Sequence, residues 1–286
     1  MGNILDYARE IRVSFEEKPF CEVDSLILCQ LSNLQLSTVC DAEHEITIRR
    51  LAEEHDTPAL YHDAWVAGKT RRLLLLLAEN PRFSNMRLRF FHEEYDARRE
   101  TQFAAVTFTF YDISYLAFRG TDMTFIGWKE DFNMAHTFPV PAQAAGYAYL
   151  RSVAPKLTTR MILGGHSKGG NIALYAAHEA EDNLLSRIEA IYCHDNPGFR
   201  DSLYDMRFKR FESRVFKTLP RSSLVGMILC HQGEYSVVKN HYPGFLQHNP
   251  FTWRIQNGEF CKVSALSRYA SLRNRILNEW INGLSL

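Results

Sequence analysis

The residues best suited to do chemistry lie around one serine. Gly165-His166-Ser167-Lys168-Gly169 matches the pattern G-x-S-x-G. An apolar run that predicts a strand precedes this segment, and an alanine-rich run that predicts a helix follows it. This context is typical of a nucleophile elbow, a sharp strand-to-helix turn that projects the serine hydroxyl above a sheet. The pattern therefore predicts that Ser167 is a nucleophile.

The residues beside Ser167 fit such a turn for physical reasons. Side chains at Gly165 and Gly169 would collide with the neighbouring strand and helix. The positive end of the following helix favours a developing anion, and the backbone N–H of Lys168 is the predicted donor to that anion. The alternative is a glycine-rich turn in a non-catalytic α/β domain. A phosphate loop is disfavoured, because G-x-x-x-x-G-K-[ST] is absent.

A serine hydroxyl needs a base to take its proton, and a carboxylate must orient that base. In α/β-hydrolases the acid and then the histidine follow the serine along the chain. Asp195 comes directly after the next predicted strand and is the predicted acid. Its alternative role is that of a turn residue before Pro197. Asp201 and Asp205 are weaker candidates for the acid.

The predicted base is His248, which lies in a loop after the last predicted strands of the sheet. His231 ends an apolar run and could equally be a core or turn residue, and His241 is the reserve candidate. His166 and His194 flank the predicted site, and packing or solvent contact is the role expected of them.

The pattern of apolar residues changes near residue 80. Residues 3–80 look helical, because apolar residues recur three and four positions apart in 23–36 and 59–77. Asp56-Thr57-Pro58 predicts the start of the second of these helices. Beyond residue 80, β-branched and aromatic runs alternate with helical ones. The predicted strands there are 86–91, 103–110, 113–118, 161–164, 188–193, 214–219, 224–230 and 235–239, and the predicted helices are 142–154, 171–180 and 264–280.

Strands that alternate with helices predict an α/β fold, with a mostly parallel central sheet covered by helices on both faces. We expect residues 1–80 to form a helical segment packed on or covering the core. Residues 81–286 are expected to form that core, so that the chain is one continuous domain.

Composition and charge disfavour several classes of protein. The 33 Lys and Arg residues equal the 33 Asp and Glu residues, which favours neither nucleic acid nor an anionic surface as a partner. No secretory signal is evident, and the longest apolar run, 73–78, is too short to span a bilayer. The six scattered cysteines predict reduced thiols, without a disulfide framework or a metal site. We expect a cytoplasmic protein without a cofactor; peripheral membrane contact stays open.

Another segment resembles a known family. The predicted strand 113–118 leads into Ala117-Phe118-Arg119-Gly120-Thr121, similar to the A-F-R-G-[ST] signature of the class 3 lipases. Those enzymes carry a Trp and an Asp in the next turn, matched here by Trp128 and Asp131. The resemblance implies that Thr121 supplies the second oxyanion donor. A structural ion pair, with Asp131 as the candidate partner, is the expected role of Arg119.

The chain is more closely similar to an uncharacterised bacterial family of lipase-like α/β-hydrolases. The similarity rests on the N-terminal helical segment, the elbow G-H-S-K-G-G-N and the late run Q-H-x-P-F-x-W at 247–253. One feature departs from the class 3 pattern, which usually places the acid one strand later than Asp195. The present chain has Ser222-Ser223 there and no carboxylate.

The predicted reaction is hydrolysis of a carboxylic ester, on a small molecule or a lipid, through a Ser-His-Asp triad and an acyl-enzyme. The aromatic stretches 208–216 and 242–253 could line an acyl pocket or belong to the core. A thioesterase, acyltransferase or peptidase with the same triad is the first alternative. An inactive hydrolase-fold binding protein is the second, kept open by Ser222-Ser223. The sequence leaves open the acyl length, a lid role for residues 1–80 and the oligomeric state.

Overall fold

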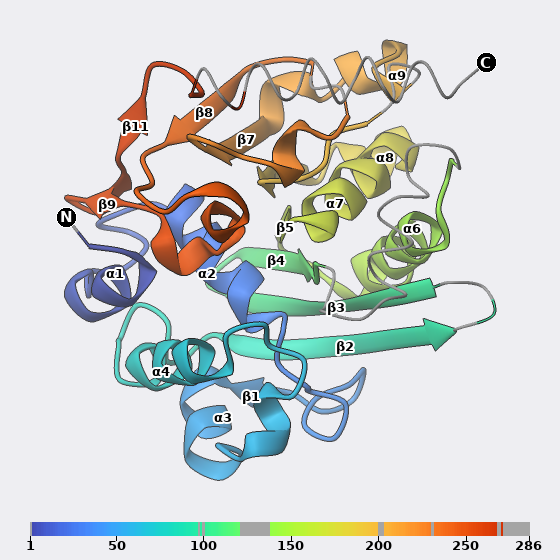
Figure 1. Cartoon of the computed structure of the whole chain (residues 1–286). Helices are drawn as coiled ribbons and strands as arrows, with labels where there is room; N and C mark the ends of the chain where they lie inside the picture. Colours follow the sequence, from blue (N-terminus) through green and yellow to red (C-terminus); the bar gives the residue numbers. More distant parts are fainter. Residues whose placement is uncertain are drawn as a thin grey trace.

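A central sheet divides the helices of the protein into two layers (Figure 1). The computed structural model describes residues 2–96, 98, 101–120, 138–199, 203–229, 232–267 and 270. Within these residues the sheet has nine strands in the order β1-β2-β3-β4-β5-β6-β7-β8-β11. They are β1 Ile46–Thr47, β2 Arg87–Asp96, β3 Thr101–Phe110, β4 Ile113–Phe118, β5 Arg160–His166, β6 Ile188–His194, β7 Val215–Pro220, β8 Tyr235–Val238 and β11 Lys262–Val263. A separate pair is formed by β9 Ile255–Gln256 and β10 Glu259–Phe260.

The sheet is antiparallel at its ends and parallel in its centre. Strands β1 to β4 pair antiparallel, β4 to β8 pair parallel, and β11 pairs antiparallel with β8. Tyr111 and Asp112 form the predicted hairpin turn between β3 and β4. Because parallel strands end at the same edge, the residues that follow β5, β6 and β7 are brought together. This edge carries the candidate site.

The N-terminal segment covers one face of the sheet. It contains α1 Ile4–Glu10, α2 Glu22–Leu31, α3 Ile48–Glu54, the 3₁₀ turn η1 Pro58–Tyr61 and α4 Ala67–Ala78. The prediction of one helix over 59–77 was wrong, because η1 and α4 are separate. Thr57 precedes η1 and Pro58 lies in its first turn as predicted, but the Thr57 side chain makes no capping hydrogen bond. The Asp56 carboxylate accepts hydrogen bonds from Tyr61 and Arg71, which ties the two elements together across the break.

The other face is covered by α6 Pro141–Val153, α7 Lys168–Glu179 and shorter helices, among them α8 Asp182–Leu185 and α9 Met206–Lys209. Alternation along each strand separates two cores. In β5, Ile162 joins the core of the N-terminal helices, whereas Met161 and Leu163 join the core of α6 and α7. Helices on both faces of the parallel part are the arrangement that the sequence predicts.

Two other predicted elements need comment. The predicted strand 224–230 was wrong where it is described, because Val225–Met227 forms the 3₁₀ turn η5. Its apolar residues imitate a strand, but the backbone N–H of Gly226 bonds the carboxylate of Asp195 instead of a neighbouring strand. Almost all of the predicted helix 264–280 lies outside the described residues.

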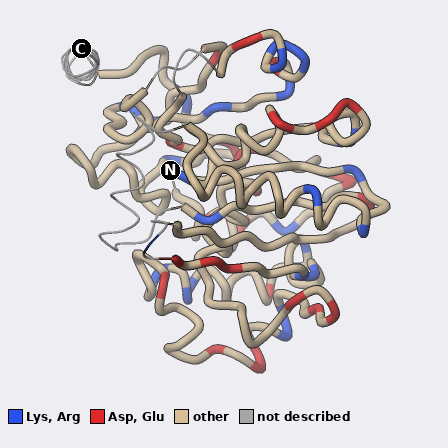
Figure 2. Tube along the Cα trace, turned by 90° about the vertical axis from the view of Figure 1, so that its right-hand side faces the viewer, with Lys and Arg blue, Asp and Glu red and all other residues tan. Residues whose placement is uncertain are grey.

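Charges of both signs are interspersed over the face shown in Figure 2. This distribution agrees with the equal numbers of acidic and basic residues in the sequence. No helix in the described part of the chain combines the length and the apolar character needed to cross a membrane.

Candidate active site

Ser167 occupies a strained turn between β5 and α7. Its backbone has φ 59° and ψ −133°, a conformation that residues other than glycine rarely adopt. Its N–H donates to the carbonyl of His194 at the end of the neighbouring strand, at 2.8 Å. Strain of this kind persists only where the surroundings hold it, and it clusters at active sites. The backbone geometry is that of the predicted nucleophile elbow.

The glycines around Ser167 are required by contacts between backbone atoms. A Cβ atom on Gly165 would lie 2.1 Å from the carbonyl carbon of Gly169. One on Gly169 would lie 2.1 Å from the carbonyl oxygen of Phe118 at the end of β4. The predicted collisions with helix and strand are therefore confirmed. A Cβ on Gly120 would come within 3.3 Å of the Ser167 Cβ, so the chain leaving β4 starts beside the serine.

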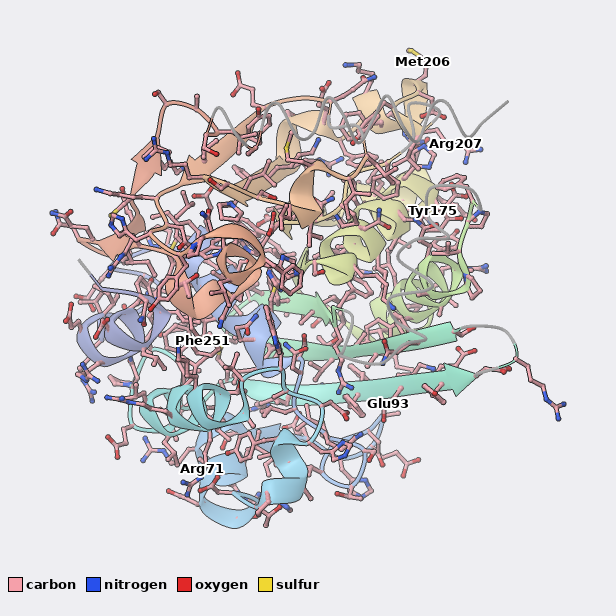
Figure 3. All side chains as sticks on the ribbon, viewed as in Figure 1. Arg71, Glu93, Tyr175, Met206, Arg207 and Phe251 are labelled. Carbon is pink, nitrogen blue, oxygen red and sulfur yellow. The ribbon has the colours of Figure 1, made fainter. Side chains whose placement is uncertain are left out.

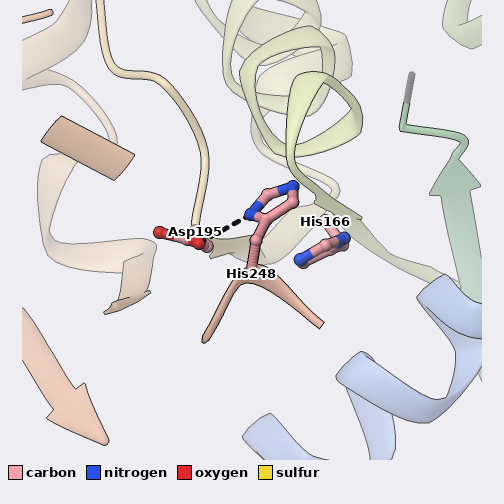
Figure 4. A group of neighbouring side chains, drawn as sticks. All are labelled: His166, Asp195 and His248. Carbon is pink, nitrogen blue, oxygen red and sulfur yellow. Dashed lines mark hydrogen bonds and ion pairs between the residues drawn. The ribbon is translucent and has the colours of Figure 1, made fainter. Parts of the chain in front are cut away.

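The predicted acid and base are joined by a hydrogen bond. His248 Nδ1 donates to Asp195 Oδ2 at 2.7 Å (Figure 4). Asp195 is fully buried, has a positive φ of 44° and follows β6 directly, while His248 ends the 3₁₀ turn η6 Gly244–His248. In Figure 4 the second ring nitrogen of His248 points away from Asp195, toward the start of α7. The pair can therefore orient an imidazole at the elbow.

Ser222-Ser223, the position where the class 3 pattern usually places the acid, contributes a hydrogen bond to Asp195 instead. The Ser223 hydroxyl donates to Asp195 Oδ1, and the N–H of Gly226 donates to the same oxygen at 3.1 Å. A Cβ on Gly226 would lie 2.4 Å from this oxygen, so the turn η5 closes tightly over it. Ser223, which follows β7, thus orients the carboxylate of Asp195, which follows β6. This role was not predicted from the sequence, although a serine at an expected acid position was the signal for it.

Two further histidines lie beneath the catalytic candidates. The rings of His166 and His248 lie with their centroids 4.4 Å apart and are tilted by 32°. Burial, together with the neighbouring His248 and His194, holds the pKa of His166 well below its usual value. His194 Nε2 bonds Ser25 of α2 at 2.9 Å, and burial lowers the pKa of His194 to about 3. Both rings are therefore neutral at pH 7. The expected packing role is confirmed for both.

The loop that carries His248 is anchored on both sides. The side-chain oxygen of Gln247 accepts a hydrogen bond from the Ser222 N–H at 2.7 Å. The backbone carbonyl of Gln247 accepts one from the Trp253 indole N–H at 2.9 Å. Phe251 and Trp253 are buried in the core shared with the N-terminal helices. Figure 3 shows Phe251 between this loop and α4. The residues of the run Q-H-x-P-F-x-W at 247–253 thus hold the loop of His248 in place.

The two predicted oxyanion donors differ in what can be described. Lys168 is the first residue of α7, where a backbone N–H points out of the end of the helix. Its amine donates to the Gln102 carbonyl on β3 at 3.0 Å. Thr121, Trp128 and Asp131 lie outside the described residues.

Arg119 forms an ion pair as expected, but with Asp63 and Glu93; the candidate partner Asp131 lies outside the described residues. The guanidinium contacts Asp63 and Glu93, each at 2.9 Å, and donates to the carbonyls of Ser32 and Leu34. Most of these partners belong to the N-terminal segment. The segment therefore fixes the end of β4, just before the predicted oxyanion loop.

The competing candidates do not join the site. Asp205 caps α9 and bonds His178, and His241 is exposed; Asp201 and His231 lie outside the described residues. Of the two links in the predicted triad, the described residues form the one between acid and base. No hydrogen bond joins the Ser167 hydroxyl to His248 among them. Such links are often long without substrate and tighten when it binds.

A serine at a strained strand-to-helix turn and a hydrogen-bonded Asp–His pair, on a sheet covered on both faces, define a protein of the α/β-hydrolase fold. The predicted fold class is confirmed. The chain belongs to the Mbeg1-like family, whose model matches residues 77–286. The predicted lipase-like family is confirmed at this level, and its bacterial origin stays a prediction.

Several fungal proteins have similar solved structures. Rhizomucor miehei lipase, in a propeptide complex, shares 15% identity at a TM-score of 0.42, over 54% of this chain and 57% of that one. The lipase of Rhizopus microsporus var. chinensis shares 15% identity at a TM-score of 0.41, over 71% of this chain and 72% of that one. MDLA of Penicillium cyclopium shares 12% identity at a TM-score of 0.48, over 82% of this chain and 83% of that one. The present chain thus spans little more than half of the Rhizomucor miehei chain. No curated protein matches the sequence.

Proposed function

We propose that the protein is a serine hydrolase that cleaves carboxylic esters through Ser167, His248 and Asp195. The observation that carries this proposal is the 2.7 Å hydrogen bond from His248 to a buried Asp195, beside a serine held at φ 59°. A structural turn would need neither the strained backbone nor a buried carboxylate aimed at an imidazole. The combination is the one that activates a serine hydroxyl.

The steps follow from the positions of these groups. The Ser167 Oγ attacks the ester carbonyl while His248 takes the proton of the hydroxyl. Asp195 stabilises the imidazolium that forms. The backbone N–H groups of Lys168 and Thr121 are the proposed donors to the oxyanion. His248 then protonates the leaving alcohol, and a water molecule activated in the same way releases the acid.

The surroundings of His248 favour an apolar acyl group. Trp65 and Phe245 lie with their ring centroids 6.0 and 5.6 Å from the imidazole, and Trp65 is 37% exposed. Leu246, next to Phe245 in the chain, is 52% exposed. Apolar surface beside a few convergent polar groups is typical of a site for a small ligand. We therefore propose an ester with a hydrocarbon acyl chain, either a small molecule or a lipid.

The test is labelling and turnover in matched variants. Wild-type protein should react with a fluorophosphonate probe and hydrolyse p-nitrophenyl esters, whereas Ser167→Ala should lose both, with kcat lower by about 10⁴-fold or more. Asp195→Asn should keep the fold and lose kcat by about 10⁴-fold, because the imidazole then adopts the wrong tautomer. Ser186→Ala, at an exposed serine of the same chain, is the control that should retain activity.

Equal labelling of wild type and Ser167→Ala would refute the proposal. A panel of esters, thioesters, acyl acceptors and peptides separates ester hydrolysis from the other reactions of the same triad. Folded wild-type protein that reacts with none of them would favour a binding protein.

A further inference from the structure

Three metal-binding side chains converge in the candidate site. One ring nitrogen of His166, one of His248 and a carboxylate oxygen of Asp195 all lie within 4.8 Å of one another, and all three residues are buried. In Figure 4 the rings of His166 and His248 lie one beside the other, and a nitrogen of His166 points to the side where Asp195 bonds His248. A triad for ester hydrolysis needs only one of these histidines.

His166 has a binding capacity that the proposed reaction leaves unused. Its Nε2 is buried and has no hydrogen-bond partner within the described residues. A buried imidazole nitrogen without a partner is costly unless something binds it. Its ring is held in place by the contact with His248 on one side and by Trp253, whose ring centroid lies 6.2 Å away.

Asp195 is already oriented as a metal ligand would be. Its Oδ1 accepts from Ser223 and from the N–H of Gly226, which leaves Oδ2 directed at His248. Hydrogen bonds to the second oxygen of a ligating carboxylate fix its direction and are a regular part of metal sites.

We propose that His166, His248 and Asp195 bind a Zn²⁺ ion, which inhibits the hydrolase. Two imidazole nitrogens and one carboxylate oxygen are a ligand set that zinc accepts, with a fourth position left for water. Ligand atoms of a tetrahedral zinc site lie roughly 3.4 Å apart, which follows from metal–ligand bonds of about 2.1 Å. The three atoms here are within 4.8 Å, so shifts of about an ångström suffice.

Inhibition follows from either mode of binding to His248. Zinc on Nε2 occupies the lone pair that would accept the Ser167 proton. Zinc on Nδ1 separates His248 from Asp195 and moves the ring proton to Nε2, which then has no lone pair to offer. Inhibition rests on the proposed function, whereas binding of the ion does not.

Binding is therefore measured without reference to activity. Full-length Ser167→Ala protein, stripped with EDTA, is titrated with ZnCl₂ by calorimetry and in competition with a chromogenic chelator. We expect one zinc per chain, and binding weaker by about 100-fold or more when His166→Phe, which keeps a ring against His248, is added. Asp195→Asn is the second variant and should weaken binding similarly. His44→Phe, at an exposed histidine paired with Asp41, should leave the zinc affinity unchanged.

Activity is measured in parallel on protein with Ser167 intact. Zinc should inhibit ester hydrolysis at the concentrations at which it binds, and EDTA should restore it. Absence of stoichiometric zinc binding would refute the metal site even if the enzyme hydrolyses esters. So would a zinc affinity that stays at the level of the Ser167→Ala parent when His166→Phe or Asp195→Asn is added to it and the protein remains folded. Zinc binding that depends on His166 in a protein without esterase activity would instead refute the proposed function alone.

Discussion

The elbow at Ser167 and the loop that carries His248 provide the two halves of the candidate site, but different contacts hold them. The elbow depends on backbone atoms of adjoining elements: Gly165 and Gly169 admit the close approach of α7 and β4. The loop 244–253 depends on side chains from far along the chain. The geometry of the loop therefore depends on packed side chains, whereas the geometry of the elbow depends on contacts between backbone atoms.

The N-terminal segment is what the loop packs against. Trp65 contacts the His248 ring, the amine of Lys69 lies 5.9 Å from the Phe251 ring centroid, and Gly2 exchanges backbone hydrogen bonds with Ile255 just beyond the loop. This segment lies almost wholly outside the residues that match the family model. The candidate nucleophile is thus supported by the sheet, and the candidate base by the N-terminal helices.

The largest expected effect is on the elbow. Gly169→Ala should destabilise the protein by roughly 3 kcal/mol or more and abolish ester hydrolysis, because the new Cβ meets a backbone carbonyl that cannot move aside. Urea unfolding and a fluorophosphonate assay measure the two effects. The matched control is Gly68→Ala in α4, where a Cβ meets nothing within 4 Å. That variant should gain up to about 1 kcal/mol, and an equal loss in both variants would contradict the dependence of the elbow on this backbone contact.

The support of the loop is tested by two substitutions of equal size. Phe251→Leu and Phe211→Leu each remove an aromatic ring from one of the two cores, and each should cost about 1–1.5 kcal/mol. Only Phe251→Leu should lower kcat, because only Phe251 belongs to the loop of His248. Activities measured well below both unfolding midpoints decide this. If both variants kept wild-type kcat, the N-terminal core would not position the histidine.

A third prediction concerns pH and His194, which joins β6 to α2. Because the pKa of His194 is lowered to about 3 in the folded state, the unfolded state takes up a proton first as the pH falls. The stabilisation is complete above pH 6.5 and is lost as the pH falls from there toward 3, with a slope of up to about 1.4 kcal/mol per pH unit. Urea unfolding at several pH values should show His194→Gln with a shallower slope by that amount.

The smallest expected effect is that of Trp65→Ala. Because Trp65 is 37% exposed, its removal should change the free energy of unfolding by less than about 1 kcal/mol. The loss of its contact with His248 should still lower kcat/KM several-fold for esters with long acyl chains, and less for acetate esters. Equal losses for both esters would assign Trp65 a role in holding the loop instead of the acyl chain.

The elbow, the strands of the parallel part and the candidate acid and base were predictable from the sequence. These follow from local patterns: glycines at fixed distances from a serine, apolar runs of strand length, and the order of residues after successive strands. The break between η1 and α4 and the turn η5 could not be predicted in this way. Each depends on hydrogen bonds to one carboxylate, Asp56 or Asp195, and hydrophobic periodicity carries no information on such bonds.

The surroundings of Asp195 and His248, in contrast, follow from the tertiary structure. Ser223 is remote from Asp195 in sequence, and it becomes a donor to this carboxylate because β6 and β7 are neighbours in the sheet. His166 belongs to the elbow motif, yet its contact with His248 exists because the N-terminal helices hold the distant loop above it. Spacing along the chain predicts which residues share an edge of the sheet. Which side chains touch there is decided by packing between segments that the sequence does not place side by side.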